Sequence, residues 1–246
     1  MGTVIRSWWK NFLNLIYPLS CLICKSRLNP LSDKPLCAQC WEKLEFISPP
    51  FCRLCGRHLP AESQAQALIC KDCQKSACSF KKARSVCIYD GIIKQCIHLF
   101  KYKAKLSLVE PLAKLMVEFA GQYLDLQTID LILPVPLHKR KLRQRQFNQA
   151  GLLAAGLSRA YSKPMPDSLL LRIKSGPAQI NLSQAQRLKN VRGAFRVKTG
   201  ADIKDKNILL VDDVLTTKAT ANECAKMLLG AGAKSVEVLT LAQSKS

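Results

Sequence analysis

The sequence has few acidic side chains and few aromatic ones. Only 17 of its 246 residues are Asp or Glu, against 38 Lys and Arg, which gives a formal net charge of +21. Such an excess of positive charge favours polyanionic partners: nucleic acid, phosphorylated metabolites or an anionic membrane surface. A merely solvated basic surface is the alternative. Because aromatic residues make up only 7% of the chain, base stacking would contribute little to any nucleic-acid binding.

The sequence also lacks a membrane-spanning run and a cleavable signal peptide. Its apolar start is interrupted by Lys10 and Asn11 and has no small-residue cleavage site, so a reducing cytoplasm is the expected location. Residues 1–20 instead predict a short amphipathic helix, too short to cross a bilayer. This helix packs on the neighbouring module or, in the alternative, docks on a partner or at the membrane surface through Trp8 and Trp9.

Cysteine is sparse after the first third of the chain and crowded within it. Two residues between cysteines let both thiolates of a tight turn face one ion, and a second such turn closes a tetrahedral site with no open position. Residues 21–80 therefore predict two structural Zn²⁺ sites in a double zinc ribbon. Spacing leaves open whether the pairs combine sequentially or interleave. The predicted ligands are two evenly spaced sets: Cys21, Cys24, Cys37, Cys40 and Cys52, Cys55, Cys70, Cys73.

Apolar strands alternate with amphipathic helices over residues 81–246. Strands that are apolar throughout and separated by helices predict an α/β domain with a parallel sheet covered on both faces, and ligands bind at the carboxyl ends of such strands. The expected strands cover residues 83–89, 131–136, 208–211 and 236–241, and the expected helices cover 92–100, 108–123, 149–160 and 219–229.

The sharpest local motif, Val211–Thr220, lies where an apolar strand gives way to a helix. Free N–H groups at a helix N-terminus attract phosphate, and two carboxylates suit vicinal ribose hydroxyls. The segment resembles the 5-phosphoribosyl-1-pyrophosphate (PRPP) signature of type I phosphoribosyltransferases. The alternative is an ordinary acidic turn before a Thr-capped helix. The resemblance implies a PRPP site with Mg²⁺, in which the acids hold the ribose and the loop holds the 5-phosphate: Asp212, Asp213, Thr216, Thr217, Lys218, Ala219 and Thr220.

Two basic segments add candidate pyrophosphate ligands. Arg140, Arg143 and Arg145 follow the strand that ends near Pro136, and Arg side chains can fork onto phosphate oxygens; a solvated charged face is the alternative. Residues 182–195 suggest a mobile lid whose closure would bring Arg187 to the charge developing on pyrophosphate. An exposed basic helix is the alternative for this second segment.

Together these segments resemble the ComF family of competence-associated proteins over nearly the whole chain from Cys21. The match includes Phe100–Lys103 and the run from Leu182 to Gly193. It implies a type I phosphoribosyltransferase-like parallel sheet flanked by helices, preceded by a double zinc ribbon. It also implies a bacterial cytoplasmic role in DNA uptake during natural transformation, with single-stranded DNA and the uptake machinery at the inner face of the membrane as partners.

Two functions are consistent with this resemblance. In the first, the chain is a phosphoribosyltransferase, with Asp212, Asp213 and Arg187 as its catalytic residues. In the second, it is a non-catalytic zinc-ribbon module that binds nucleic acid and whose transferase fold only senses or retains PRPP. Lys218 and Gln146 stand where the family usually has glycine in its phosphate loops, which predicts weaker PRPP binding and turnover.

Overall fold

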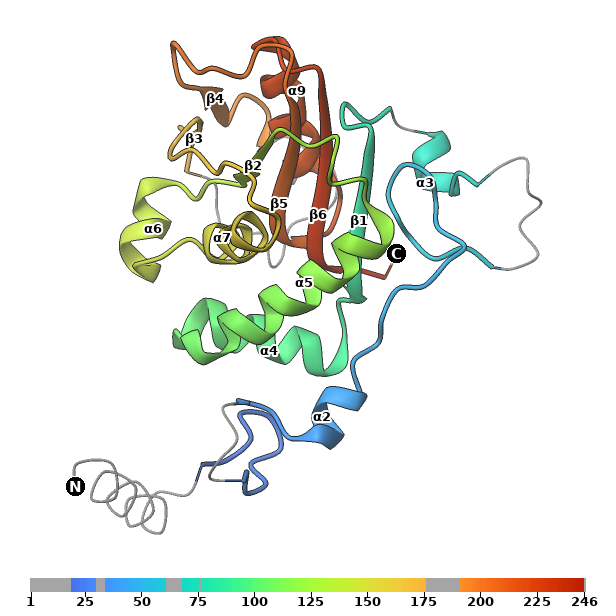
Figure 1. The fold of residues 1–246 in the computed structure, drawn as a ribbon, viewed down its shortest axis with the longest axis vertical. Helices are drawn as coiled ribbons and strands as arrows, with labels where there is room; N and C mark the ends of the chain where they lie inside the picture. The colour runs from blue at the N-terminus through green and yellow to red at the C-terminus, as the bar shows by residue number, and fades with distance from the viewer. Residues whose placement is uncertain (1–18, 30–33, 61–67, 76, 176–190, 246) are drawn as a thin grey trace.

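The computed structural model of the chain describes residues 19–29, 34–60, 68–75, 77–175 and 191–245. Within this part, a parallel sheet has the strand order β1-β6-β5-β2 (Figure 1). The helix predicted over residues 1–20 lies outside the described residues except for its last two, of which Ser20 forms a β-bridge with Arg27. The strands of the sheet are β1 Lys82–Ile88, β2 Leu131–Pro134, β5 Asn207–Leu215 and β6 Ser235–Gln243.

Each face of the sheet has its own apolar core. Along β5, Leu209 and Val211 belong to the core under α4, α5 and α7, whereas Ile208 and Leu210 belong to the core under α9. This alternation is what a strand buried on both faces requires. The predicted parallel α/β architecture is therefore confirmed. The covering helices are α4 Gly91–Lys103, α5 Val109–Tyr123, α7 Gln149–Tyr161 and α9 Ala219–Gly230.

Several short elements complete the described structure. The cationic segment after β2, for which no helix was predicted, forms helix α6, Lys139–Arg145. His138 caps it: the His138 Nδ1 accepts a hydrogen bond from the Arg140 N–H at 3.2 Å. Strands β3 Leu170–Arg172 and β4 Phe195–Val197 pair antiparallel beside α9. The cysteine region carries α2 Ala38–Glu42 and α3 Lys71–Gln74, and a 3₁₀ helix, η1 Leu106–Leu108, precedes α5. In the described part of the chain, no helix has the length and apolar character needed to cross a membrane.

The cysteine region covers the outer edge of β1. The Ile47 N–H donates to the Val86 carbonyl at 2.9 Å, and the Ala83 N–H donates to the Leu54 carbonyl at 2.6 Å. An edge strand otherwise presents unpaired backbone groups to solvent. Residues from Glu45 to Leu54 therefore bond to the edge strand of the sheet.

Gly56, in the second cysteine set, lies close against the backbone of β1. Its φ is +73°, and a Cβ at this position would collide with the carbonyl oxygen of Ala83. Only glycine combines this left-handed conformation with so close a backbone contact. The turn after Cys55 thus docks on the strand through a position that tolerates no side chain.

Gly56→Ala is expected to lower the free energy of unfolding by roughly 2–4 kcal/mol, because it adds left-handed strain and a backbone collision. Gly200→Ala is the matched control: its φ is +75° and nothing lies within 4 Å of the added Cβ, so only the conformational cost of about 1 kcal/mol remains. Urea denaturation of both variants measures the difference. Equal losses for the two variants would show that the contact with β1 contributes nothing.

Candidate functional site

The predicted acidic pair lies near the carboxyl end of β5. The sequence suggested that the two acids follow the strand. In the structure the strand continues to Leu215, so the acids lie within its last residues. The buried Asp213 carboxylate forms an ion pair with the Nζ of Lys101 from α4, at 2.7 Å. The Asp213 N–H also donates to the Asp212 carboxylate at 2.8 Å. A parallel sheet binds ligands at this edge.

The two carboxylates have different electrostatic surroundings. Burial and then repulsion by Asp213 raise the pKa of Asp212 to about 7, against the attraction of Lys101. Burial alone would lower the pKa of Lys101, but attraction to Asp213 outweighs it and the pKa is raised. Lys101 therefore stays charged and pairs with Asp213. Asp212 is the carboxylate that gains most from an added cation, because a nearby positive charge favours its ionised form.

A cluster of cations surrounds the pair. Burial lowers the pKa of Lys141, and repulsion from neighbouring cations adds to this effect; those cations are Arg172, Arg145 and Lys101. Arg145 also lies over the Tyr102 ring, at 5.1 Å from its centroid. Cations that repel one another in a half-buried place form a strong site for a polyanion.

The three predicted arginines of helix α6 differ in exposure. Lys141 and Arg145 are half-buried and one turn apart, so they share one face of the helix, which lies near Lys101. Arg140 and Arg143 are exposed. Arg187 lies outside the described residues, so its predicted catalytic place stays a prediction.

The phosphate loop follows directly after β5. The side chains of Thr216, Thr217 and Thr220 are half-buried, and they make no hydrogen bond to another described residue. Ala219 begins α9, whose first N–H groups have no partner within the helix. The loop therefore offers the hydroxyls and amides that a phosphate needs.

Both positions that depart from the family pattern have left-handed backbones. The φ of Lys218 is +63° and that of Gln146 is +66°. A non-glycine residue in this region costs about 1–2 kcal/mol. The structure thus places each substitution where glycine is favoured.

Sequence reasoning missed four residues of this site: Lys101, Lys141, Gln149 and Arg172. Gln149 is buried, and its Oε1 accepts a hydrogen bond from Arg145 at 3.0 Å, whereas its Nε2 has no partner among the described residues. Lys141 could have been found from its i, i+4 spacing to Arg145. Lys101 carries no such signal, because it lies on α4, more than a hundred residues before Asp213, with which it pairs.

The eight predicted zinc ligands form two tetracysteine clusters, within each of which all sulfurs lie within 4.8 Å of one another. Pairing is sequential, which the spacing had left open. The Cys24 and Cys37 sulfurs are 3.5 Å apart, and those of Cys55 and Cys70 are 3.7 Å apart. Ligands of tetrahedral Zn²⁺, with Zn–S bonds of about 2.3 Å, stand about 3.8 Å from one another. The geometry and the soft donors therefore fit zinc.

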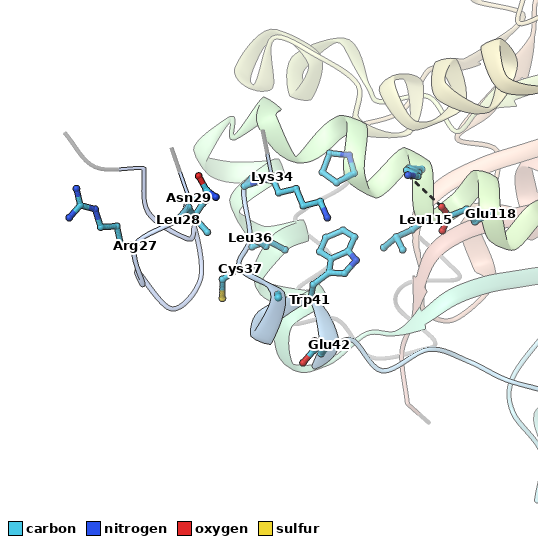
Figure 2. A pocket seen from close by; sticks show the side chains of 14 residues that line it. Arg27, Leu28, Asn29, Lys34, Leu36, Cys37, Trp41, Glu42, Leu115 and Glu118 are labelled. Atoms are coloured by element: carbon cyan, nitrogen blue, oxygen red, sulfur yellow. Dashed lines mark ion pairs between the residues drawn. The ribbon is translucent and has the colours of Figure 1, made fainter. Parts of the chain in front are cut away.

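A groove of about 510 Å³ lies elsewhere, between the first cysteine cluster and α5. Figure 2 shows Trp41 from α2 and Leu115 from α5 in its lining. None of the predicted PRPP residues lines it, and its walls are mainly apolar. The candidate site is therefore the acidic pair and not this groove.

Comparison with known proteins finds a matching family model and similar proteins that cover nearly the whole chain. Residues 12–87 match the model of the double zinc ribbon domain. The chain is 30% identical to "Competence protein F" of Haemophilus influenzae, over 95% of this chain and 99% of that one. It is 29% identical to "DNA utilization protein YhgH" of Salmonella typhimurium, over 94% and 99% of the two chains.

Among solved structures, the chain resembles a purine phosphoribosyltransferase from Pyrococcus horikoshii. The alignment has 19% sequence identity and covers 55% of this chain and 72% of that one, with a TM-score of 0.34. This score is too low for the likeness to support an argument about the site.

Replacing Cys21, Cys40, Cys55 or Cys73 by Ser is expected to remove one of two bound zinc ions and to unfold the affected cluster. A structural zinc contributes on the order of 10 kcal/mol to folding of a small module. Zinc content by mass spectrometry and the protease pattern measure the loss. Cys96→Ala, at a buried cysteine outside both clusters, should keep both ions. A wild-type protein without zinc would contradict the assignment.

Lys101→Met is expected to destabilise the protein by about 3 kcal/mol, because it leaves Asp213 buried without its partner. Adding Asp213→Asn should recover most of this loss, since no unpaired charge then remains. Urea denaturation of the two single variants and the double variant gives the coupling free energy between Lys101 and Asp213. Additive losses would mean that the ion pair is not what holds Lys101 in place.

Proposed function

The chain belongs to the ComF family of competence proteins, and from this premise we propose that it binds PRPP with Mg²⁺ at the acidic pair and acts on single-stranded DNA in DNA uptake. The observation that carries the proposal is the arrangement at the end of β5. An acidic pair, a Thr-rich loop at a helix N-terminus and several half-buried cations converge there. PRPP presents the matching groups: ribose hydroxyls, a 5-phosphate and a pyrophosphate.

The charges fit the two ends of this substrate. Thr216, Thr217 and the first N–H groups of α9 suit the 5-phosphate, and Lys141 and Arg145 suit the pyrophosphate. Asp212 fits a Mg²⁺ ion, because it is the carboxylate without an ion pair and carboxylates with substrate phosphates are the usual ligands of this ion. When bound, Mg²⁺ would neutralise charge on the pyrophosphate.

We infer phosphoribosyl transfer as the reaction. Asp212 and Asp213 would hold the ribose while Lys141 and Arg145 stabilise the negative charge that develops on the departing pyrophosphate. Lys101 would act indirectly, by holding the Asp213 carboxylate in place through their ion pair. Arg187 is proposed to reach the same charge from the segment between β3 and β4.

The proposed role in DNA uptake rests on the names of the relatives, which are a competence protein and a DNA utilization protein. It also rests on the charge of the chain. Four thiolates on each zinc leave two negative charges per cluster, so the net charge with zinc is still about +17. Exposed Arg140 and Arg143 stand on the outer face of α6. There they suit nucleic-acid phosphates better than a substrate in the site.

The alternative is a module that binds nucleic acid and retains PRPP without turning it over. Lys218 and Gln146 favour it, since both occupy left-handed positions in the phosphate loops. Pyrophosphate release on adding PRPP and a panel of nucleobases decides between the two. Release that depends on a base establishes transfer, and PRPP binding without release establishes the alternative.

Asp212→Asn combined with Asp213→Asn is expected to abolish binding of Mg²⁺–PRPP in calorimetry. Lys218→Gly is expected to tighten it, because glycine relieves the left-handed strain and uncovers the loop amides. Asp202→Asn is the matched control: this exposed carboxylate precedes the amino end of β5 and should leave binding unchanged. Weaker PRPP binding by Lys218→Gly would show that the lysine is itself a phosphate ligand.

Single-stranded DNA is expected to bind with little sequence preference and with an affinity that falls steeply with salt. Arg140→Ala with Arg143→Ala should reduce the slope of log affinity against log salt by about two, since each phosphate contact contributes about one. The same double variant should keep its affinity for PRPP. A wild-type affinity that is independent of salt would exclude the nucleic-acid proposal.

A further inference from the structure

Lys218 touches the second cysteine cluster. Its Nζ lies 3.2 Å from the Sγ of Cys73. The lysine is half-buried, precedes α9 and belongs to the connection that follows β5. Cys73 is buried and belongs to α3, more than a hundred residues earlier in the chain. One side chain thus joins the phosphate loop to a predicted zinc ligand.

The contact lies in an interface held by other bonds. The Ser79 N–H donates to the Asn222 side chain of α9 at 2.5 Å, and the Gln243 amide donates to the Cys55 carbonyl at 3.2 Å. These bonds fix the cluster against both α9 and β6. The lysine therefore meets Cys73 across a fixed interface rather than from a free surface.

The chemistry of the contact suits a zinc thiolate. Four cysteinates on one Zn²⁺ leave a net charge of −2, which is unfavourable in a partly buried place unless a cation or N–H donors offset it. The Nζ of Lys218 supplies both. This role also accounts for a lysine at a left-handed position, because the contact with the cluster offsets the strain of the backbone.

We propose that Lys218 is a positioning residue for the second zinc cluster: its ammonium donates a hydrogen bond to the Cys73 thiolate and slows loss of zinc from that cluster alone. The role does not depend on PRPP binding. It predicts that replacing Lys218 by glycine frees the phosphate loop and loosens the metal at the same time.

The test follows zinc loss from each cluster separately. Zinc-loaded protein is mixed with excess chelator, free thiols are alkylated at timed intervals, and mass spectrometry of peptides reports the labelling of Cys70 and Cys73 against that of Cys21 and Cys24. Lys218→Met, which keeps the length but loses the donor, should speed labelling of the second cluster about tenfold. This matches the 10- to 100-fold cost of losing an outer partner of a metal ligand. The first cluster should keep its wild-type rate.

Two variants make the outcome specific. Lys218→Arg keeps a cationic donor and should stay close to the wild-type rate. Lys71→Met removes the same charge from an exposed position of α3, beside Cys70, and should also leave the rate unchanged. An unchanged second cluster in Lys218→Met overturns the proposal. So does equal acceleration of both clusters, which would mean general loosening. Because neither readout involves PRPP, failure here leaves the proposed function untouched.

Discussion

The outer edge of β1 sets the main constraint on this structure. An edge strand of a parallel sheet leaves backbone N–H and carbonyl groups unpaired unless another segment covers them. Here the cover is the cysteine region, which bonds to β1 on both sides of Arg84 and packs closely against it at Gly56. The second cluster has a small apolar core made largely of its own cysteines, so its shape depends on the metal.

The ligand edge of the same sheet is built on a local excess of positive charge. Lys101 pairs with Asp213, and among the described residues the cations Lys101, Lys141, Arg145 and Arg172 lie near one another beside Asp212. Such a cluster is stable when an anion with several charges is bound between its members. Asp212 has a raised pKa in spite of this excess, because its burial and the repulsion by Asp213 outweigh the attraction of Lys101.

Most of the sheet and its helices could be predicted from the sequence, because buried strands and amphipathic helices have distinct periods. The predicted strand over residues 208–211 was too short, since Asp212 and Asp213 break the apolar run while the backbone stays extended. Helix α6 was missed because its residues are nearly all cationic, and its cap depends on His138. The place of Lys101 depends on its contact with Asp213, in a distant part of the chain. No local pattern carries that information.

The two left-handed positions show how such distant contacts change the meaning of a motif. Gln146 ends α6 with an exposed side chain that bonds to no other described residue. No side-chain contact therefore offsets its backbone strain of about 1–2 kcal/mol. Lys218 has the same backbone but reaches Cys73. Lysine in place of glycine at residue 218 is unfavourable for the predicted phosphate loop, but it also adds a contact with the second cysteine cluster. If that contact holds the cluster and the loop binds PRPP as proposed, PRPP affinity and zinc retention place opposite demands on residue 218, and a lysine there favours the metal.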